Sequence, residues 1–112
     1  MPTVFVSQLP HKRDSLTGIW TPAYNVDPAN EHGTVQILVP PRATFNNSNQ
    51  LIPQLRQTFD YDFKRGDCLV LLGDPFIIAA VVAMATAKGD VRVLRWDRNL
   101  GRYIPVVLRL AA

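Results

Sequence analysis

Cysteine and histidine are scarce in this 112-residue chain, and their scarcity limits its chemistry. The single cysteine, Cys68, excludes an internal disulfide and fits a reducing compartment. The two histidines, His11 and His32, lie far from Cys68 in the sequence, so no zinc pattern can be assembled. We therefore expect no metal and no cofactor. Cys68 opens an apolar strand, where it is expected to be inert core.

The chain also lacks a basic-then-apolar leader, because residues 1–5 already have the composition of a strand, so no signal peptide is expected. Residues 68–87 are mostly apolar, and hydropathy alone would favour a membrane span. However, an Asp-Pro pair interrupts the run, and the uninterrupted part, 76–87, is too short to cross about 30 Å of hydrocarbon. We expect one domain, residues 1–112, without membrane contact and located in the cytoplasm.

The stretch 68–89 organises the expected fold. It predicts a buried strand over 68–73, an abrupt turn, and an apolar helix over 76–87 that ends at Gly89. Asp74 is a good N-cap, and Pro75 then occupies the first helical position, where its missing N–H costs nothing.

The remaining elements follow from local composition. Strands that alternate with helices over 34–96 require parallel pairing and right-handed crossovers, whereas the short loop before the last strand requires antiparallel pairing. The predicted fold class is α/β, a single three-layer domain whose mixed sheet has a parallel β-α-β-α-β centre flanked by N- and C-terminal β-hairpins. The expected segments are a hairpin of 3–9 and 19–25, a helical turn capped by Asp27, a strand over 34–39, a helix near 49–59, and strands over 91–96 and 103–110.

Two loops share one spacing. Asp14 and Asp97 are each followed by three residues, a glycine, one residue, an aromatic residue, one residue and a proline. Asp can accept hydrogen bonds from its own loop, and the glycine can supply a positive φ at the exit. We interpret the match as shared turn chemistry and not as a duplication.

The carboxyl ends of the parallel strands are the usual place for a ligand in an open sheet. Arg42 and Thr44 follow one such end and Asp74 follows another, which predicts an anion or ligand site with Asp74 as a general base or metal ligand. Neither loop has a phosphate-binding glycine pattern, and the sequence places no catalytic partner beside Asp74. The alternative for Asp74 is a helix cap alone.

The helix over 76–87 has no polar face. Such a helix is either buried all round or presents one face to a partner. Ala79, Ala83 and Thr86 form a small, smooth stripe, which predicts a homodimer interface. The alternative is that another segment of the same chain covers the stripe.

Basic residues are concentrated near the C-terminus. Residues 88–112 contain six basic and two acidic residues, whereas residues 1–87 contain six and seven. On the C-terminal hairpin, arginine and aromatic side chains can bind nucleic acid or form a protein interface. The alternative is that the arginines only discourage another strand from pairing with the edge of the sheet. The expected binding residues are Arg92, Arg95, Trp96, Arg98, Arg102 and Tyr103.

Several short motifs resemble small uncharacterised proteins of tailed bacteriophages. They are Leu72–Pro75 and Leu94–Pro105, together with Phe5–Gln8, Thr17–Trp20 and Glu31–Gly33. The resemblance implies a viral origin and action in the host cytoplasm or in the particle, and it transfers no catalytic residue.

Three functions stay open at this point. The first is a non-enzymatic phage accessory protein that binds a host or phage macromolecule through the C-terminal hairpin. The second is nucleic-acid binding by the same basic surface. The third is a small nucleotide-binding protein or enzyme with its site near Arg42 and Asp74.

Overall fold

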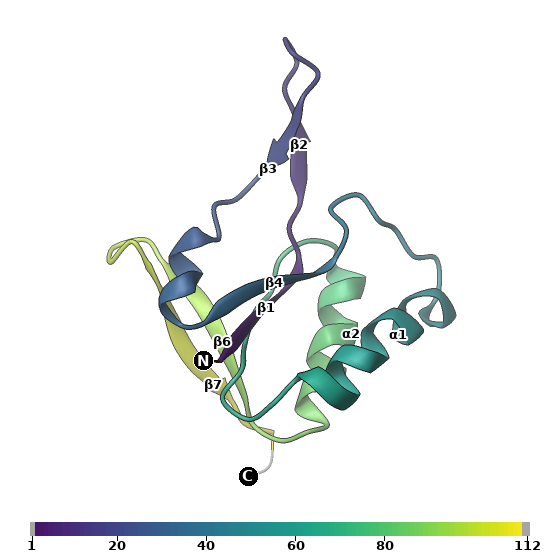
Figure 1. Cartoon of the computed structure of the whole chain (residues 1–112), viewed down its shortest axis with the longest axis vertical. Coiled ribbons are helices and arrows are strands. Elements are labelled where there is room, and N and C mark those ends of the chain that lie inside the picture. The colour runs from purple at the N-terminus through teal and green to yellow at the C-terminus, as the bar shows by residue number, and fades with distance from the viewer. Residues whose placement is uncertain (1, 111–112) are drawn as a thin grey trace.

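The structure, a computed structural model, describes residues 2–110, apart from the side chain of Ser48. Its centre is a five-stranded sheet with the order β4-β1-β5-β6-β7 (Figure 1). Four neighbouring strands are parallel, and β7 runs antiparallel to β6, which confirms the predicted fold class. In chain order the strands of this sheet are β1 (Thr3–Gln8), β4 (Thr34–Val39), β5 (Cys68–Val70), β6 (Val91–Asp97) and β7 (Arg102–Leu108).

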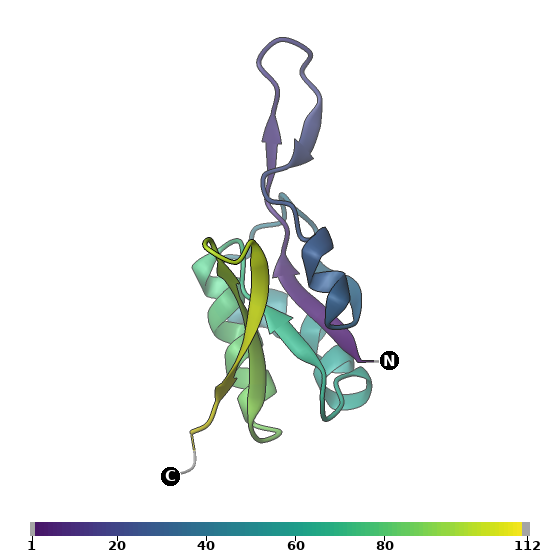
Figure 2. The ribbon, with the colours of Figure 1, turned by 90° about the vertical axis from the view of Figure 1, so that its left-hand side faces the viewer.

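Helices of unequal size cover the two faces of the sheet. The helix α1 (Ser48–Gln57), prolonged by η2 (Thr58–Asp62), lies beside α2 (Pro75–Thr86) on one face, and the short η1 (Asp27–Glu31) lies on the other (Figures 1 and 2). Right-handed crossovers explain this division. The connections β4–β5 and β5–β6 step in one direction across the sheet, whereas β1–β4 steps in the opposite direction.

The core has two parts, one on each face. Between the sheet and the two long helices, Phe5, Leu55 and Leu69 are among the fully buried side chains. On the opposite face, Val26 and Ala29 from the η1 region pack against apolar side chains of β1, β5, β6 and β7. Both faces of β1 and β5 are therefore covered, and this explains why each strand is apolar at consecutive positions, over 4–6 and 68–70.

The N-terminal hairpin is present, but it is smaller and differently placed than the sequence predicted. The strand β1 is a central strand between β4 and β5, and it does not pair with residues 19–25. The hairpin forms only beyond Pro10, from β2 (His11–Arg13) and β3 (Trp20–Pro22), and it projects from the body as an arm (Figure 2). The predicted pairing of 3–9 with 19–25 was wrong, because both edges of β1 pair with strands of the main sheet, β4 and β5.

The predicted start of α2 is confirmed. The Asp74 carboxylate accepts a hydrogen bond from the Phe76 N–H at 2.9 Å, with Pro75 in the first turn. Asp27 is not a cap; instead, the Asn25 side chain accepts from the Asp27 N–H at 3.0 Å. Over residues 2–110, the longest apolar helix falls short of the length that a membrane crossing requires.

Candidate binding groove at the carboxyl end of the sheet

A groove opens where β5 and β6 separate. The two strands pair only at Cys68 with Arg92 and at Leu69 with Val93, although β6 continues to Asp97. The buried Ser7 of β1 holds the continuation of β5, because its hydroxyl accepts from the Leu72 N–H at 2.8 Å and donates to the Leu72 carbonyl. The chain after β5 therefore stays with β1, and β6 continues with β7 alone.

The cavity at this separation has a volume of about 840 Å³, and we call it the aromatic groove. Its walls come from the segment before η1, the end of β5, and the hairpin of β6 and β7. The lining is mainly apolar and aromatic, with Arg95 as its charged side chain. Among the residues that line it are Tyr24, Leu72, Leu94, Arg95, Trp96 and Tyr103.

Aromatic rings give this groove its character. The rings of Trp96 and Tyr103 meet edge to face with centroids 5.1 Å apart, so the pair is held in a fixed geometry. Tyr103 is buried, and this burial raises the pKa of its phenol. Trp96 is 48% exposed and Tyr24 is 56% exposed, so two ring surfaces remain available to a ligand.

Only part of the predicted hairpin surface converges on the groove. Arg95, Trp96 and Tyr103 line it together. Arg102 is instead neutralised by Glu31, whose carboxylate accepts from its Nε at 3.1 Å and from its Nη2 at 2.8 Å. The other two predicted arginines lie elsewhere, Arg98 in the exposed loop after β6 and Arg92 opposite Cys68 near the start of β6.

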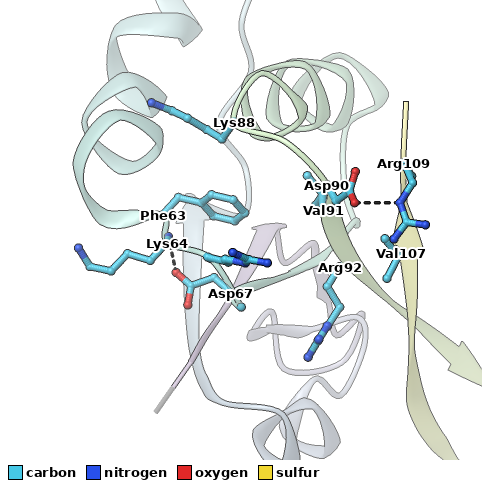
Figure 3. Close-up of a pocket in the computed structure, with 11 residues that line it drawn as sticks. Phe63, Lys64, Asp67, Lys88, Asp90, Val91, Arg92, Val107 and Arg109 are labelled. Atoms are coloured by element: carbon cyan, nitrogen blue, oxygen red, sulfur yellow. Dashed lines mark hydrogen bonds and ion pairs between the residues drawn. The ribbon is translucent and has the colours of Figure 1, made fainter. Parts of the chain in front are cut away.

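Arg92 belongs to a second cavity, a basic cleft of about 440 Å³ at the amino ends of β5 and β6 (Figure 3). Its acids are already partnered: Asp90 accepts from Arg109 at 2.9 Å, and Asp67 accepts from the backbone N–H groups of Thr3 and Lys64. Figure 3 shows Lys64 and Lys88 extending to one side and Arg92 to another, so these cations do not converge on one point. The basic residues of the cleft are Lys64, Arg65, Lys88, Arg92 and Arg109.

The predicted ligand site at the strand ends is occupied by a side chain of the protein. Gln8, at the end of β1, donates from Nε2 to the carbonyls of Pro40 and Ala43 at 2.9 and 3.2 Å. Its Oε1 accepts from the Asp74 N–H at 3.0 Å. The crevice in which comparable folds bind a ligand is thus filled from within.

The predicted ligand residues have other contacts. The Asp74 carboxylate caps α2, and the Arg42 guanidinium lies over the Trp20 ring, 4.5 Å from its centroid. Thr44 is exposed in the loop after β4. The structure therefore does not bring Arg42, Thr44 and Asp74 together around an open cavity.

Comparison with known proteins places the chain in a family. The sequence profile of one family, described as Phage Pam3 gp32-like protein, matches residues 2–110. The chain belongs to this family. The match confirms the resemblance to small phage proteins, and it includes every element that forms the aromatic groove. No curated protein and no solved structure matches the chain.

In this phage protein, the stripe on α2 lies at the surface. Ala79 and Ala83 are exposed, and the half-buried Thr86 donates its hydroxyl to the Val82 carbonyl at 2.8 Å. Neither α1 nor the arm covers the exposed alanines. A homodimer through Ala79, Ala83 and Thr86 stays a prediction.

The exposed apolar tip of the arm is a feature that the sequence interpretation missed. Leu16 at its tip is 94% exposed, and the neighbouring Ile19 and Trp20 are exposed as well. Hydrogen bonds shape the loop, because the Asp14 carboxylate accepts from the N–H groups of Leu16 and Thr17. The sequence signal for this exposed tip was the presence of two apolar residues, Leu16 and Ile19, within a stretch of turn residues.

Proposed function

We propose that this phage protein is a non-enzymatic binding protein that holds a protein partner in the aromatic groove. The observation that carries the proposal is the grouping of two exposed rings, Trp96 and Tyr24, around one cavity with the single cation Arg95. Aromatic and arginine side chains supply most of the binding energy at protein interfaces. At such interfaces these side chains cluster in well-packed pockets from which water is excluded.

Nucleic acid fits the same groove less well. Binding to nucleic acid depends on several phosphate contacts made by lysine or arginine. Among the four arginines of the hairpin, only Arg95 lines the groove, and Arg102 is neutralised by Glu31. A partner with one acidic group beside an apolar or aromatic segment matches this distribution of charge.

Catalysis is not part of the proposal, because the residues that suggested it have structural roles. Asp74 is used as a helix cap, and Gln8 fills the crevice at the strand ends. In the groove, burial raises the pKa of the Tyr103 phenol, which makes this group a weaker acid than a free phenol.

The test is capture of a partner from a lysate of phage-infected bacteria, with and without nuclease. We expect the wild-type protein to capture a protein under both conditions, and Tyr24→Ser and Trp96→Ala to lose it. Trp20→Ala removes an exposed tryptophan from the arm and serves as the matched control, which should retain capture. Circular dichroism confirms that each variant is folded.

The salt dependence of the captured interaction then separates the two partner classes. A partner held mainly by the groove should lose less than about tenfold in affinity between 50 and 200 mM salt, whereas six or more phosphate contacts would cost about a thousandfold or more. Capture that disappears with nuclease, or that survives in both groove variants, contradicts the proposal.

A further inference from the structure

The two edges of the main sheet differ in their protection against strand addition. The edge strand β7 has Pro105 near its middle, begins with Arg102 and is followed by Arg109. Proline and basic residues are the devices by which natural sheets prevent pairing with another chain. At the other edge, β4 has the sequence Thr-Val-Gln-Ile-Leu-Val, with no charge and no proline.

The outer side of β4 is open. Among the strands of residues 2–110, β4 pairs only with β1, so the backbone groups on its other side have no ladder. Its side chains are exposed at Thr34, Gln36 and Ile37, and Ile37 is 38% exposed. An uncharged edge of six residues is a template for a further strand.

We propose that β4 is the interface of a homodimer, in which it pairs antiparallel with β4 of a second copy around a two-fold axis at Gln36. The two five-stranded sheets then join into one continuous sheet. A two-fold interface brings the same surface of both copies together, so any charge on it would face a like charge. Because β4 has no charged residue, its two copies can pair without this repulsion.

The register between the two copies of β4 follows from which of its side chains share a face of the sheet. Val35 and Ile37 lie on the same face, because they pair with Val4 and Val6 of β1. With Gln36 opposite Gln36 of the second copy, Val35 lies opposite Ile37 of that copy, and the pair occurs twice. Cross-strand pairs of β-branched residues stabilise a sheet, and a shift of one residue would place opposed side chains on different faces.

Cysteine cross-linking tests both the interface and its register. Directly opposed Cα atoms in an antiparallel pair are about 4.5–5.5 Å apart, within the range that a disulfide spans. We expect the Gln36→Cys protein to form a disulfide-linked dimer under mild oxidation. The native Cys68 is buried and does not compete.

Two variants serve as controls. In the proposed register, the Thr34→Cys sulfurs are offset by four residues, roughly 13 Å along the strands, so little dimer should form. Ala83→Cys tests the stripe on α2 in the same assay. Cross-linking at position 83 with none at position 36, or at none of the three positions, overturns the proposal.

Sedimentation measures the oligomeric state without introducing a cysteine. We expect the wild-type protein to be a dimer at high micromolar concentration and Ile37→Lys to be a monomer with an unchanged circular dichroism spectrum. Val106→Lys, at an exposed position on β7, is the matched control and should remain a dimer. A wild-type protein that is monomeric, or an Ile37→Lys variant that remains dimeric while folded, contradicts the interface.

Discussion

A single buried amide, that of Gln8, determines the shape of the carboxyl edge of the sheet. Its three hydrogen bonds join β1 to the loop after β4 and to the start of α2. Gly73 permits this contact, because a Cβ there would lie 2.5 Å from the Gln8 Oε1 and its φ is +93°. A residue within a strand thus occupies the space between the loop after β4 and the start of α2.

Replacing Gln8 by methionine tests this role. The substitution keeps the length of the side chain but leaves the carbonyls of Pro40 and Ala43 and the N–H of Asp74 without their partner. We expect the free energy of unfolding to fall by about 2–4 kcal/mol, because each buried group without a partner costs about 1–3 kcal/mol and some regain water. Urea denaturation measures the change. Gln57→Met, on the exposed side of α1, should change stability by less than about 0.5 kcal/mol.

The pKa of the buried Cys68 thiol links the burial of β5 to the pH dependence of stability. Burial raises the pKa of its thiol, and the nearby Arg92 guanidinium lowers it by a smaller amount. The folded state therefore binds this proton more tightly than the unfolded state does. The resulting stabilisation is complete below the unfolded pKa, near 9.0, and is lost as the pH rises toward the folded pKa.

We expect Cys68 to react slowly with a thiol reagent at pH 8 in the native protein and at the rate of a free thiol in denaturant. Absorbance at the reagent's reporter wavelength follows both reactions. Rapid labelling of the native protein would show that β5 opens easily or that Arg92 outweighs burial. Cys68→Ser, which removes the reactive group, provides the baseline.

At the scale of elements, the sequence predicted the parts that local chemistry specifies. Asp74, Pro75 and Gly89 marked the ends of α2, and the shared spacing at Asp14 and Asp97 produced two equivalent loops. In each loop the Asp carboxylate accepts from two N–H groups, and the glycine four residues on has a positive φ. These features depend on a few adjacent residues, so a single sequence can show them.

Features that depend on contacts between distant segments escaped prediction. The pairing of β1 follows from helices that cover both of its faces, and the aromatic groove follows from the hydrogen bonds of Ser7 to Leu72. Trp96 and Tyr103 were identified from composition, but only the fold brings Tyr24 to the same groove. The pairing of Glu31 with Arg102, which neutralises that arginine, likewise depends on the fold. Sequence spacing carries no information on such contacts across the sheet.

The arm is an element that contributes little to the stability of the body. The strands β2 and β3 pair only with each other, and their residues belong to neither core cluster. Replacing residues 11–22 with a short Gly-Ser linker should therefore change the free energy of unfolding by less than about 1 kcal/mol, within the range of surface changes. Urea denaturation and the circular dichroism spectrum measure the effect. A loss above about 2 kcal/mol would assign the arm a structural role.

On the scale of the whole molecule, the two faces of the sheet are covered unequally. Two helices of ten and twelve residues protect one face, whereas within residues 2–110 the other face has only the five-residue η1. The aromatic groove lies at the end of this less covered face, beside the hairpin of β6 and β7. The proposed dimer uses the opposite edge, so both copies of the groove remain accessible.

This arrangement predicts a gradient of hydrogen exchange across the molecule. Amides of β1 and β5 should exchange most slowly, because their opening requires global unfolding, and amides of β2 and β3 should exchange fastest, because their pairing is solvent-exposed. Exchange in β4 should be slow at high protein concentration and faster after dilution, since its outer N–H groups are protected only in the dimer. Mass spectrometry of peptic fragments distinguishes these three groups. Exchange in β4 that does not depend on concentration would show that its edge stays open, and slow exchange in the arm would show that the arm packs against the body.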